Sequence, residues 1–384
     1  MELATTLKSQ TVQKRIREVG INPNYWYPVD WADQLKPGEI MPVVVWQQAI
    51  AVYRDTEGQL HALEDFCPHK GVALHKGKVQ GCHLACGYHG WEFNGSGECV
   101  GIPYVTEAQK LPRAQVRSYP VQEKHNLIWV FPGDPTFCAT CQPPDIPEFS
   151  QPGWLIVPFT AHFNAHFSIY NENCMDVFHG FVHQNLQAWF DPVLLSLQET
   201  EAAVCAEYQV SYKGRMAQFL GLSERANQVT TLPISIQYRY PYYYSSLQGV
   251  SSLYSLRQPV GPTESRSFAL FFFKVRLPGW VLKPLKPLLR TFIQRFFLRK
   301  FIAQDIEMME SEQQNYLGNS DRRYVEINPA IIALQRLIVR QYDQFMQKSS
   351  QSQTDGNPDL EKSISVSEVF TSGQAELTKE NSIG

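Results

Sequence analysis

Two short runs of this sequence, Cys67-Pro68-His69-Lys70-Gly71 and Cys86-Gly87-Tyr88-His89-Gly90-Trp91, each combine one cysteine and one histidine with glycine. Sixteen residues separate His69 from Cys86, so the two runs can form loops that hold one metal centre from two sides. Eight cysteines in a chain of 384 residues do not indicate a disulfide scaffold. Clustered Cys and His residues in such a chain indicate metal ligands.

A centre with two Cys and two His ligands is either a structural zinc site or a Rieske-type [2Fe–2S] cluster, in which the two Cys hold one iron and the two His the other. The Cys-x-His start differs from the Cys-x2-4-Cys start that is usual in zinc fingers. Pro68 and the glycines at 71, 87 and 90 suit tight loops whose backbone N–H groups approach cluster sulfides. Trp91 can shield a cluster from water. These features favour the iron–sulfur cluster over zinc.

A second set of candidate ligands lies in the run from Glu172 to His183. His179 and His183 are four residues apart, and in a helix predicted over about 168–188 they would lie on one face. Asp176 precedes His179 by three residues and shares that stripe. Two histidines and a carboxylate that leave metal positions open are typical of non-haem Fe(II) oxygenases. Zinc has no redox states and does not support that chemistry.

Two further residue pairs are weaker candidates. His162 and His166 are also four residues apart, but the run 158–167 predicts a strand, where the pair could share one sheet face. Cys138 and Cys141 form a Cys-x-x-Cys pair that no second such pair follows. A loop with two free thiols is the favoured interpretation of that pair.

The chain divides into four predicted segments and has the α+β class. They are an N-terminal helix in residues 1–23, an all-β domain at 24–145 with short strands between Gly, Pro, Asn and Asp, a mixed domain of helices on a sheet at 146–347, and a disordered tail at 348–384. The expected strands include 42–46, 50–54, 59–63, 84–88, 127–131, 155–163, 203–212, 234–240 and 268–275, and the expected later helices are 303–317 and 329–347.

Composition indicates a globular protein, with 43% apolar and 18% charged residues, and a net charge of −3 does not suggest nucleic acid as a partner. The N-terminus lacks the features of a signal peptide, and no apolar run reaches the length of a membrane span, which predicts a cytoplasmic location. Residues 274–300 are basic and leucine- and phenylalanine-rich, without an acid. This segment predicts an amphipathic helix packed on the sheet, and it could also contact a membrane peripherally or bind an acidic ferredoxin.

The Cys67–Gly71 and Cys86–Trp91 runs resemble the Rieske domain of the Rieske non-haem iron oxygenases, of the ring-hydroxylating α-subunit type. The resemblance covers roughly residues 24–135 and includes the lead-in Tyr25-Trp26-Tyr27-Pro28-Val29. It implies a [2Fe–2S] cluster on Cys67, His69, Cys86 and His89, which accepts electrons from a ferredoxin or reductase.

The run Asn173-x-x-Asp176-x-x-His179 resembles the catalytic domain of the same family. The resemblance implies that His179 and His183 bind Fe(II). It also implies that Asp176 bridges to the Rieske histidine of a neighbouring subunit, which makes Asp176 and Asn173 candidate catalytic residues and predicts a homotrimer.

The family's third iron ligand is a carboxylate far downstream, for which Asp305 in Gln304-Asp305-Ile306 is the best match. Glu307, Glu310 and Glu312 are rivals. Two features depart from the common pattern. Three residues rather than four separate the two histidines, as in the carbazole-dioxygenase type, and Gln304 replaces an acid that many members carry.

The sequence therefore predicts a mono- or dioxygenase that uses O2 and donated electrons to hydroxylate, demethylate or desaturate an organic substrate. The many aromatic and leucine residues of the second domain suggest that the substrate is bulky and apolar or aromatic. The alternatives are a Rieske electron-transfer or redox-sensing protein without oxygenase turnover and, more weakly, a zinc-stabilised binding module.

Overall fold

Strict alternation of side chains defines the largest sheet. In β13 (Ala203–Tyr212) every second residue from Val204 to Tyr212 is buried, while the residues between them are half-buried or exposed. A strand with this pattern has one face on a core and the other toward solvent. The computed structural model describes residues 12–13, 15–106, 109–183, 189–213, 224–225, 227–275, 278–319, 322 and 324–354.

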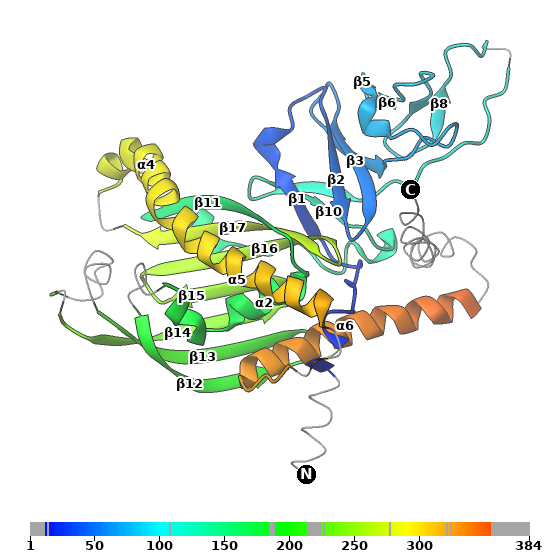
Figure 1. Cartoon of the computed structure of the whole chain (residues 1–384). Coiled ribbons are helices and arrows are strands. Elements are labelled where there is room, and N and C mark those ends of the chain that lie inside the picture. Colours follow the sequence, from blue (N-terminus) through cyan, green and yellow to red (C-terminus); the bar gives the residue numbers. More distant parts are fainter. Residues whose placement is uncertain are drawn as a thin grey trace, which may run out of the picture.

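Seven antiparallel strands form this sheet (Figure 1). In spatial order they are β11 (Trp154–Phe163), β17 (Glu264–Lys274), β16 (Ser251–Gly261), β15 (Tyr242–Leu247), β14 (Thr230–Arg239), β13 and β12 (Trp189–Glu199). The pairing of β11 with β17 runs without a shift from Trp154 opposite Lys274 to Phe163 opposite Ser265. Strands β12 to β17 follow one another as hairpins, and β11 adds at the far edge beside β17.

Helices lie across one face of this sheet (Figure 1). They are α2 (Phe167–Met175), α4 (Gly279–Ile293), α5 (Arg299–Gly318) and α6 (Pro329–Thr354), with the π-helical turn η6 (Gln294–Leu298) joining α4 to α5. Leu298 and Ile302 are buried with Leu155 and Val157 of β11, and Leu334 and Leu337 of α6 are buried with side chains of β13. The helices therefore bury one face of the sheet and bring α2 and α5 together.

A smaller all-β domain lies at one end of the sheet (Figure 1). Its three sheets have the orders β1-β10-β9, β2-β3-β4 and β5-β6-β7-β8. The strands are β1 (Tyr27–Trp31), β2 (Ile40–Val45), β3 (Gln48–Arg54), β4 (Leu60–Glu64), β5 (Lys78–Gln80), β6 (His83–Ala85), β7 (Glu92–Phe93), β8 (Cys99–Gly101), β9 (Val121–Lys124) and β10 (Leu127–Val130). The Trp46 N–H donates to the Pro259 carbonyl of β16 at 2.7 Å, and Arg266 of β17 pairs with Asp30 at 3.1 Å. These contacts fix the small domain on the large sheet.

The α+β class is confirmed, but several expected elements differ. The helix expected over about 168–188 ends at Met175, because Asp176 has an extended backbone and its Oδ1 accepts the Phe178 N–H at 2.8 Å. The strand expected at 84–88 ends at Ala85, where the Cys86 loop begins. The disordered tail was expected from residue 348, but α6 continues to Thr354. Residues 355–384 lie outside the described residues. Most of the expected helix in residues 1–23 also lies outside them, although Val12, Gln13 and Arg15 are helical.

The strand expected over 158–167 is also wrong beyond Phe163, because residue 166 is the N-cap of α2. His162 lies at the sheet edge, where it pairs with Glu264 at 2.8 Å. His166 is buried and has partners at both ring nitrogens, Ser168 at 2.7 Å and the Val19 carbonyl at 3.0 Å. These two histidines do not share a sheet face, so the alternative metal pair is excluded.

Candidate metal centres

Two loops of the small domain have the same backbone design. The Gly71 N–H donates to the Cys67 carbonyl at 2.8 Å, and the Gly90 N–H donates to the Cys86 carbonyl at 3.0 Å. Both glycines have a positive φ, +71° and +70°, which side chains other than glycine rarely adopt. Each loop therefore turns back on itself directly after its cysteine and histidine.

The four candidate cluster ligands converge at the ends of these loops. The sulfur-bearing side chains of Cys67 and Cys86 belong to one buried cluster, and the rings of His69 and His89 are 4.6 Å apart between centroids. Burial, with Cys86 close by, raises the pKa of the Cys67 thiol to about 11. The loops thus bring two thiols and two imidazoles to one place, the donor set of a Rieske cluster.

Each of the two histidines in this group has one ring nitrogen without a hydrogen-bond partner among the described residues. The Nδ1 atoms of His69 and His89 are both inaccessible to solvent and have no hydrogen-bond partner among the described residues. A buried polar atom without a partner is costly, and a bound metal would satisfy it. Trp91 stacks on His69 with centroids 4.8 Å apart, and its indole N–H donates to the Tyr104 hydroxyl at 2.8 Å. Trp91 therefore covers the His69 ring, and its role in shielding a cluster from water stays a prediction.

The second group joins two segments that are far apart in sequence. The turn η5 (Phe178–His183) carries His179 and His183, and α5 carries Asp305. The candidate ligand atoms of these three residues lie within 4.8 Å of one another. His183 Nε2 is 3.1 Å from Asp305 Oδ1, and His179 Nε2 is 3.7 Å from the same oxygen. Two imidazoles and one carboxylate on one side of a site form the facial triad of non-haem iron enzymes.

Burial, a stacked ring and a hydrogen bond fix the position of His183. Its side chain is completely buried, its ring stacks on Phe301 at 3.9 Å, and its Nδ1 is 2.9 Å from Gln304 Oε1, which can only accept. The Nδ1 must therefore carry the proton, which leaves Nε2 free toward Asp305. Burial lowers the pKa of His183, but Asp305 and Gln304 more than offset this, so that the pKa is raised. His183 Nε2 and His179 Nδ1 make no hydrogen bond within the described residues, which fits a site for a cation.

Asp305 is the carboxylate that meets the histidines, whereas its rivals face elsewhere. Asn173 Nδ2 donates to Asp305 Oδ1 at 3.4 Å. Glu310 accepts from Asn164, and Glu312 pairs with Arg17 at 2.6 Å. Glu307 is exposed on α5. Asn173 therefore touches the group directly.

Asp176 lies outside the group of three, contrary to the expectation that it shares a helical stripe with the two histidines. The α-helix ends just before it, and its Oδ1 accepts from the Asn328 side chain at 3.3 Å as well as from Phe178. The contact between Gln304 and His183 was missed in the sequence, where Gln304 was only a departure from a pattern. Its position directly before a candidate ligand was the one available signal.

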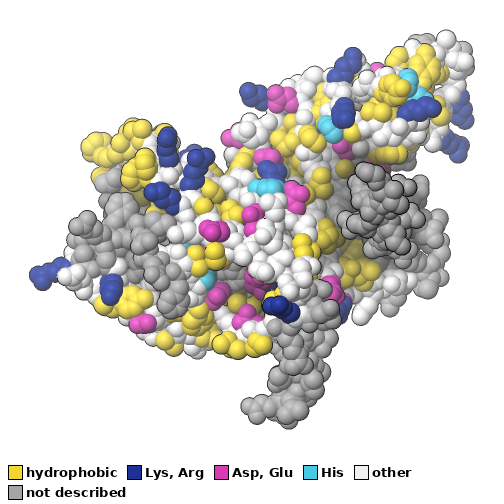
Figure 2. Space-filling view, in the orientation of Figure 1, with side chains coloured by type: hydrophobic (Ala, Val, Ile, Leu, Met, Phe, Trp, Pro, Cys, Tyr) yellow, Lys and Arg dark blue, Asp and Glu magenta, His cyan; other side chains and the backbone are white. Residues whose placement is uncertain are grey.

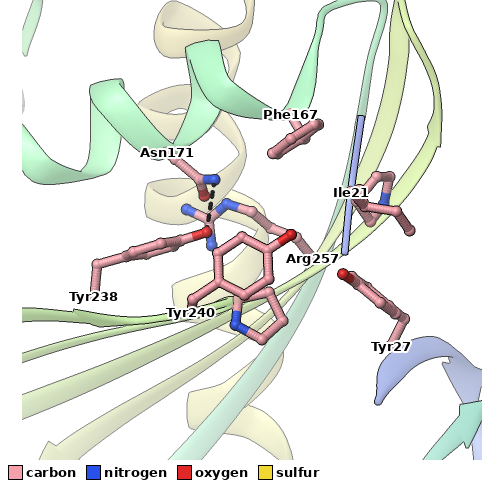
Figure 3. Close-up of a pocket in the computed structure, with 9 residues that line it drawn as sticks. Ile21, Tyr27, Phe167, Asn171, Tyr238, Tyr240 and Arg257 are labelled. Atoms are coloured by element: carbon pink, nitrogen blue, oxygen red, sulfur yellow. Dashed lines mark hydrogen bonds between the residues drawn. The ribbon is translucent and has the colours of Figure 1, made fainter. Parts of the chain in front are cut away.

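A small buried cavity lies beneath α2 (Figure 3). Its volume is about 10 Å³, room for roughly one water molecule and not for an organic substrate. Arg257 reaches into it, only 2% exposed, with its guanidinium 4.2 Å from the Tyr170 ring and two of its nitrogens without a partner in the described residues. Asn171 donates to the Tyr238 hydroxyl across the same cavity at 3.2 Å. The cavity is separate from the metal group, because neither the histidines nor Asp305 line it.

Comparison with known proteins agrees with both centres. Residues 25–120 match the Rieske [2Fe-2S] domain family, and residues 163–343 match the vanillate O-demethylase oxygenase C-terminal domain family. The 4beta-methylsterol monooxygenase of Methylococcus capsulatus is 33% identical over 344 residues, which cover 87% of this chain and 92% of that protein. Pheophorbide a oxygenase of Oryza sativa is 25% identical over 88% of this chain and 67% of its own length.

A solved structure has the same fold. The crystal structure of dicamba monooxygenase bound to 3,6-dichlorosalicylic acid has a TM-score of 0.69 at 20% identity and covers 86% of this chain and 98% of its own. Both of these sequence relatives are named as oxygenases, which favours the predicted oxygenase over the electron-carrier alternative. The chain belongs to the Rieske non-haem iron oxygenases, enzymes that carry a [2Fe–2S] cluster and a mononuclear iron.

Proposed function

We propose that this enzyme oxidises a bulky apolar substrate at an iron held by His179, His183 and Asp305. In the same proposal, Cys67, His69, Cys86 and His89 hold the cluster. One observation carries the assignment: each of the four histidines keeps one inaccessible ring nitrogen without a hydrogen bond in the described residues. The four histidines occur in two separate places, one pair beside two cysteines and the other beside a carboxylate.

Protein side chains prepare the iron site. When bound, the cluster supplies single electrons and the mononuclear iron supplies oxygen chemistry. Gln304 holds His183 in one tautomer and one orientation, which is the usual task of a residue behind a ligating histidine. Asn173 donates to Asp305 and orients the carboxylate. Phe301 covers the His183 ring and excludes water from that side.

The names of two relatives support a bulky apolar substrate. One is named for a methylsterol and another for pheophorbide a, both large apolar ring systems. The closer of these two is named a monooxygenase, which favours insertion of one oxygen atom over dioxygenation. A substrate of this kind partitions into membranes, so peripheral membrane contact belongs to the proposal. Among the described residues, no helix combines the length and apolar content needed to cross a bilayer.

Electron delivery from a ferredoxin or reductase, and assembly as a homotrimer, complete the proposal. Asp176 precedes the His179 turn, and its carboxylate is fixed by Phe178 and Asn328. The loops of the candidate cluster lie in the small domain, at the end that points away from the large sheet (Figure 1). This arrangement suits transfer from the cluster of one subunit through Asp176 to the iron of its neighbour.

Metal analysis of anaerobically purified protein tests the assignment. We expect about three irons and two acid-labile sulfides per chain, a cluster plus one separate iron. His179→Ala should lose the separate iron and turnover but keep the cluster's absorption. Two irons and two sulfides that do not change after Fe(II) is added back would refute the iron site at His179 and His183.

A further inference from the structure

An exposed apolar stripe follows the outer side of α4 and η6. Trp280 is 81% exposed, Leu288 70%, Phe292 58% and Phe296 57%, and these residues recur at multiples of four. Such spacing places them on one side of a helix. Leu282 and Leu298 are buried, and Leu298 packs with Leu155 and Val157 of β11. In Figure 2 this stripe forms the hydrophobic patch at the upper left, where Figure 1 places α4.

Positive charge accompanies the stripe. Residues 279–300 contain six Lys or Arg residues and no Asp or Glu. Five of the six are exposed, and Figure 2 shows Lys and Arg side chains directly beside the apolar patch. The six are Lys283, Lys286, Arg290, Arg295, Arg299 and Lys300. A helix with bulky apolar side chains, flanking cations and a terminal Trp has the composition of helices that lie in the interface of an anionic membrane.

We propose that α4 and η6 form a docking surface for a bilayer that contains anionic lipid, and this inference rests on the proposed apolar substrate. Trp280, Leu288 and Phe292 enter the headgroup region, and the neighbouring cations bind lipid phosphates. The surface serves the oxygenase by holding it where such a substrate dissolves.

The docking surface is continuous with the iron site. Phe297 stacks on Phe301 at 5.9 Å, and Phe301 stacks on His183 at 3.9 Å. Phe296 lies nine residues before Asp305 on consecutive helical segments, a rise of about 13 Å. Between them is the π-helical turn η6, a feature that often marks functional positions in helices. The consecutive segments α4, η6 and α5 therefore carry both the proposed lipid-facing residues and the proposed third iron ligand.

Two other occupants fit less well. A second copy that packs α4 on α4 around a two-fold axis would bring two sets of six cations together. An acidic electron donor would match the charge, but α4 and the cluster loops lie at opposite ends of the molecule (Figure 1). A large exposed Trp–Leu–Phe stripe is also more apolar than a charge-steered encounter surface requires.

Vesicle co-sedimentation of the full-length, cluster-loaded protein tests the proposal. We expect binding to phosphatidylcholine vesicles that contain about 30% phosphatidylglycerol, and much weaker binding to phosphatidylcholine alone or at about 0.5 M salt. The double variant Leu288→Glu/Phe292→Glu should lose binding at least tenfold. The matched control is Val325→Glu/Ile327→Glu, which places the same charges at two residues, each 83% exposed, just before α6. The control should bind like the wild type.

No binding to anionic vesicles, or equal losses in both double variants, would overturn the proposal. A change in oligomeric state of the α4 variant by light scattering would assign the stripe to a contact between copies instead. A loss of reduction by the electron donor, with vesicle binding unchanged, would assign it to the donor. Vesicle binding needs no turnover and metal analysis needs no vesicles, so failure of this inference is distinguishable from failure of the iron assignment.

Discussion

The two centres place their candidate ligands in different surroundings. The cluster histidines lie in two short loops of the small domain, next to Tyr88 and Tyr104, each 62% exposed. The histidines of the iron group lie in η5 and face Asp305 of α5, and His183 has no exposed side-chain surface. A centre that receives electrons from a partner must approach the surface, whereas a centre that activates O2 must exclude water. The comparison therefore separates ligands that are close in sequence and lie beside exposed aromatic residues from ligands that are distant in sequence and include one completely buried histidine.

Loss of the carboxylate should give the largest difference between the two centres. Asp305→Ala removes the group that both His179 and His183 approach, so we expect turnover to fall by roughly a hundredfold or more while the cluster remains. Activity and cluster absorption, measured on the same preparation, check this. Glu307→Ala, on the same helix and exposed, is the control and should retain activity. Full activity in Asp305→Ala would mean that another carboxylate completes the site.

The contrast between the centres also explains what the sequence could predict. Cys67, His69, Cys86 and His89 lie within 23 residues, and the glycines that shape their loops are adjacent, so the pattern was local. Asp305 is more than a hundred residues from His183, and only the packing of α5 over η5 brings them together. The resemblance to a family was needed to choose it.

Helical periodicity failed at Asp176 for a physical reason. The periodicity of the sequence does not show that the Asp176 side chain accepts the Phe178 N–H and ends α2. His179 and His183 come together in the η5 turn, as they would in an α-helix. The predicted pair therefore stands, although the predicted α-helix over these residues was wrong. The alternating strand at 203–212 was predicted with its observed bounds, because one face of that strand is buried along its whole length.

Removing the hydrogen bond behind His183 should have a smaller effect than removing a ligand. Gln304→Leu leaves the His183 Nδ1–H without an acceptor in a buried place, so we expect Fe(II) affinity to fall about tenfold to a hundredfold. Titration of apo-protein with Fe(II) measures this. Gln304→Glu keeps an acceptor and should restore most of the affinity. If Gln304→Leu and Gln304→Glu lose affinity equally, Gln304 acts by packing and does not orient the ring.

Both ring nitrogens of His166 have hydrogen-bond partners, in contrast to those of the candidate ligand histidines. Burial lowers its pKa to about 3, below the ordinary value of 6.5. The unfolded chain therefore binds a proton that the folded chain excludes, and the free energy of unfolding should fall as pH drops below 6.5, by about 2 kcal/mol at pH 5.

Urea unfolding of the wild type and His166→Gln at pH 7 and pH 5 checks this. The variant should lack that part of the pH dependence, and its iron content should equal that of the wild type. A fall in iron content would revive His166 as a ligand.

Tyr104→Phe should have the smallest effect, and it tests whether the cluster depends on the hydrogen bond between Trp91 and Tyr104. The substitution removes only the hydroxyl that accepts the Trp91 indole N–H, and water can replace it at this exposed position. The Trp91 ring still stacks on His69. We expect the rate of cluster loss in air to stay within about twofold of wild type, a free-energy difference below about 0.5 kcal/mol. Trp91→Leu removes the stacked ring itself and should speed that loss more than Tyr104→Phe does. If Tyr104→Phe loses its cluster as fast as Trp91→Leu, the hydrogen bond from Trp91 to the Tyr104 hydroxyl is what protects the cluster, and the stacked ring alone is not enough.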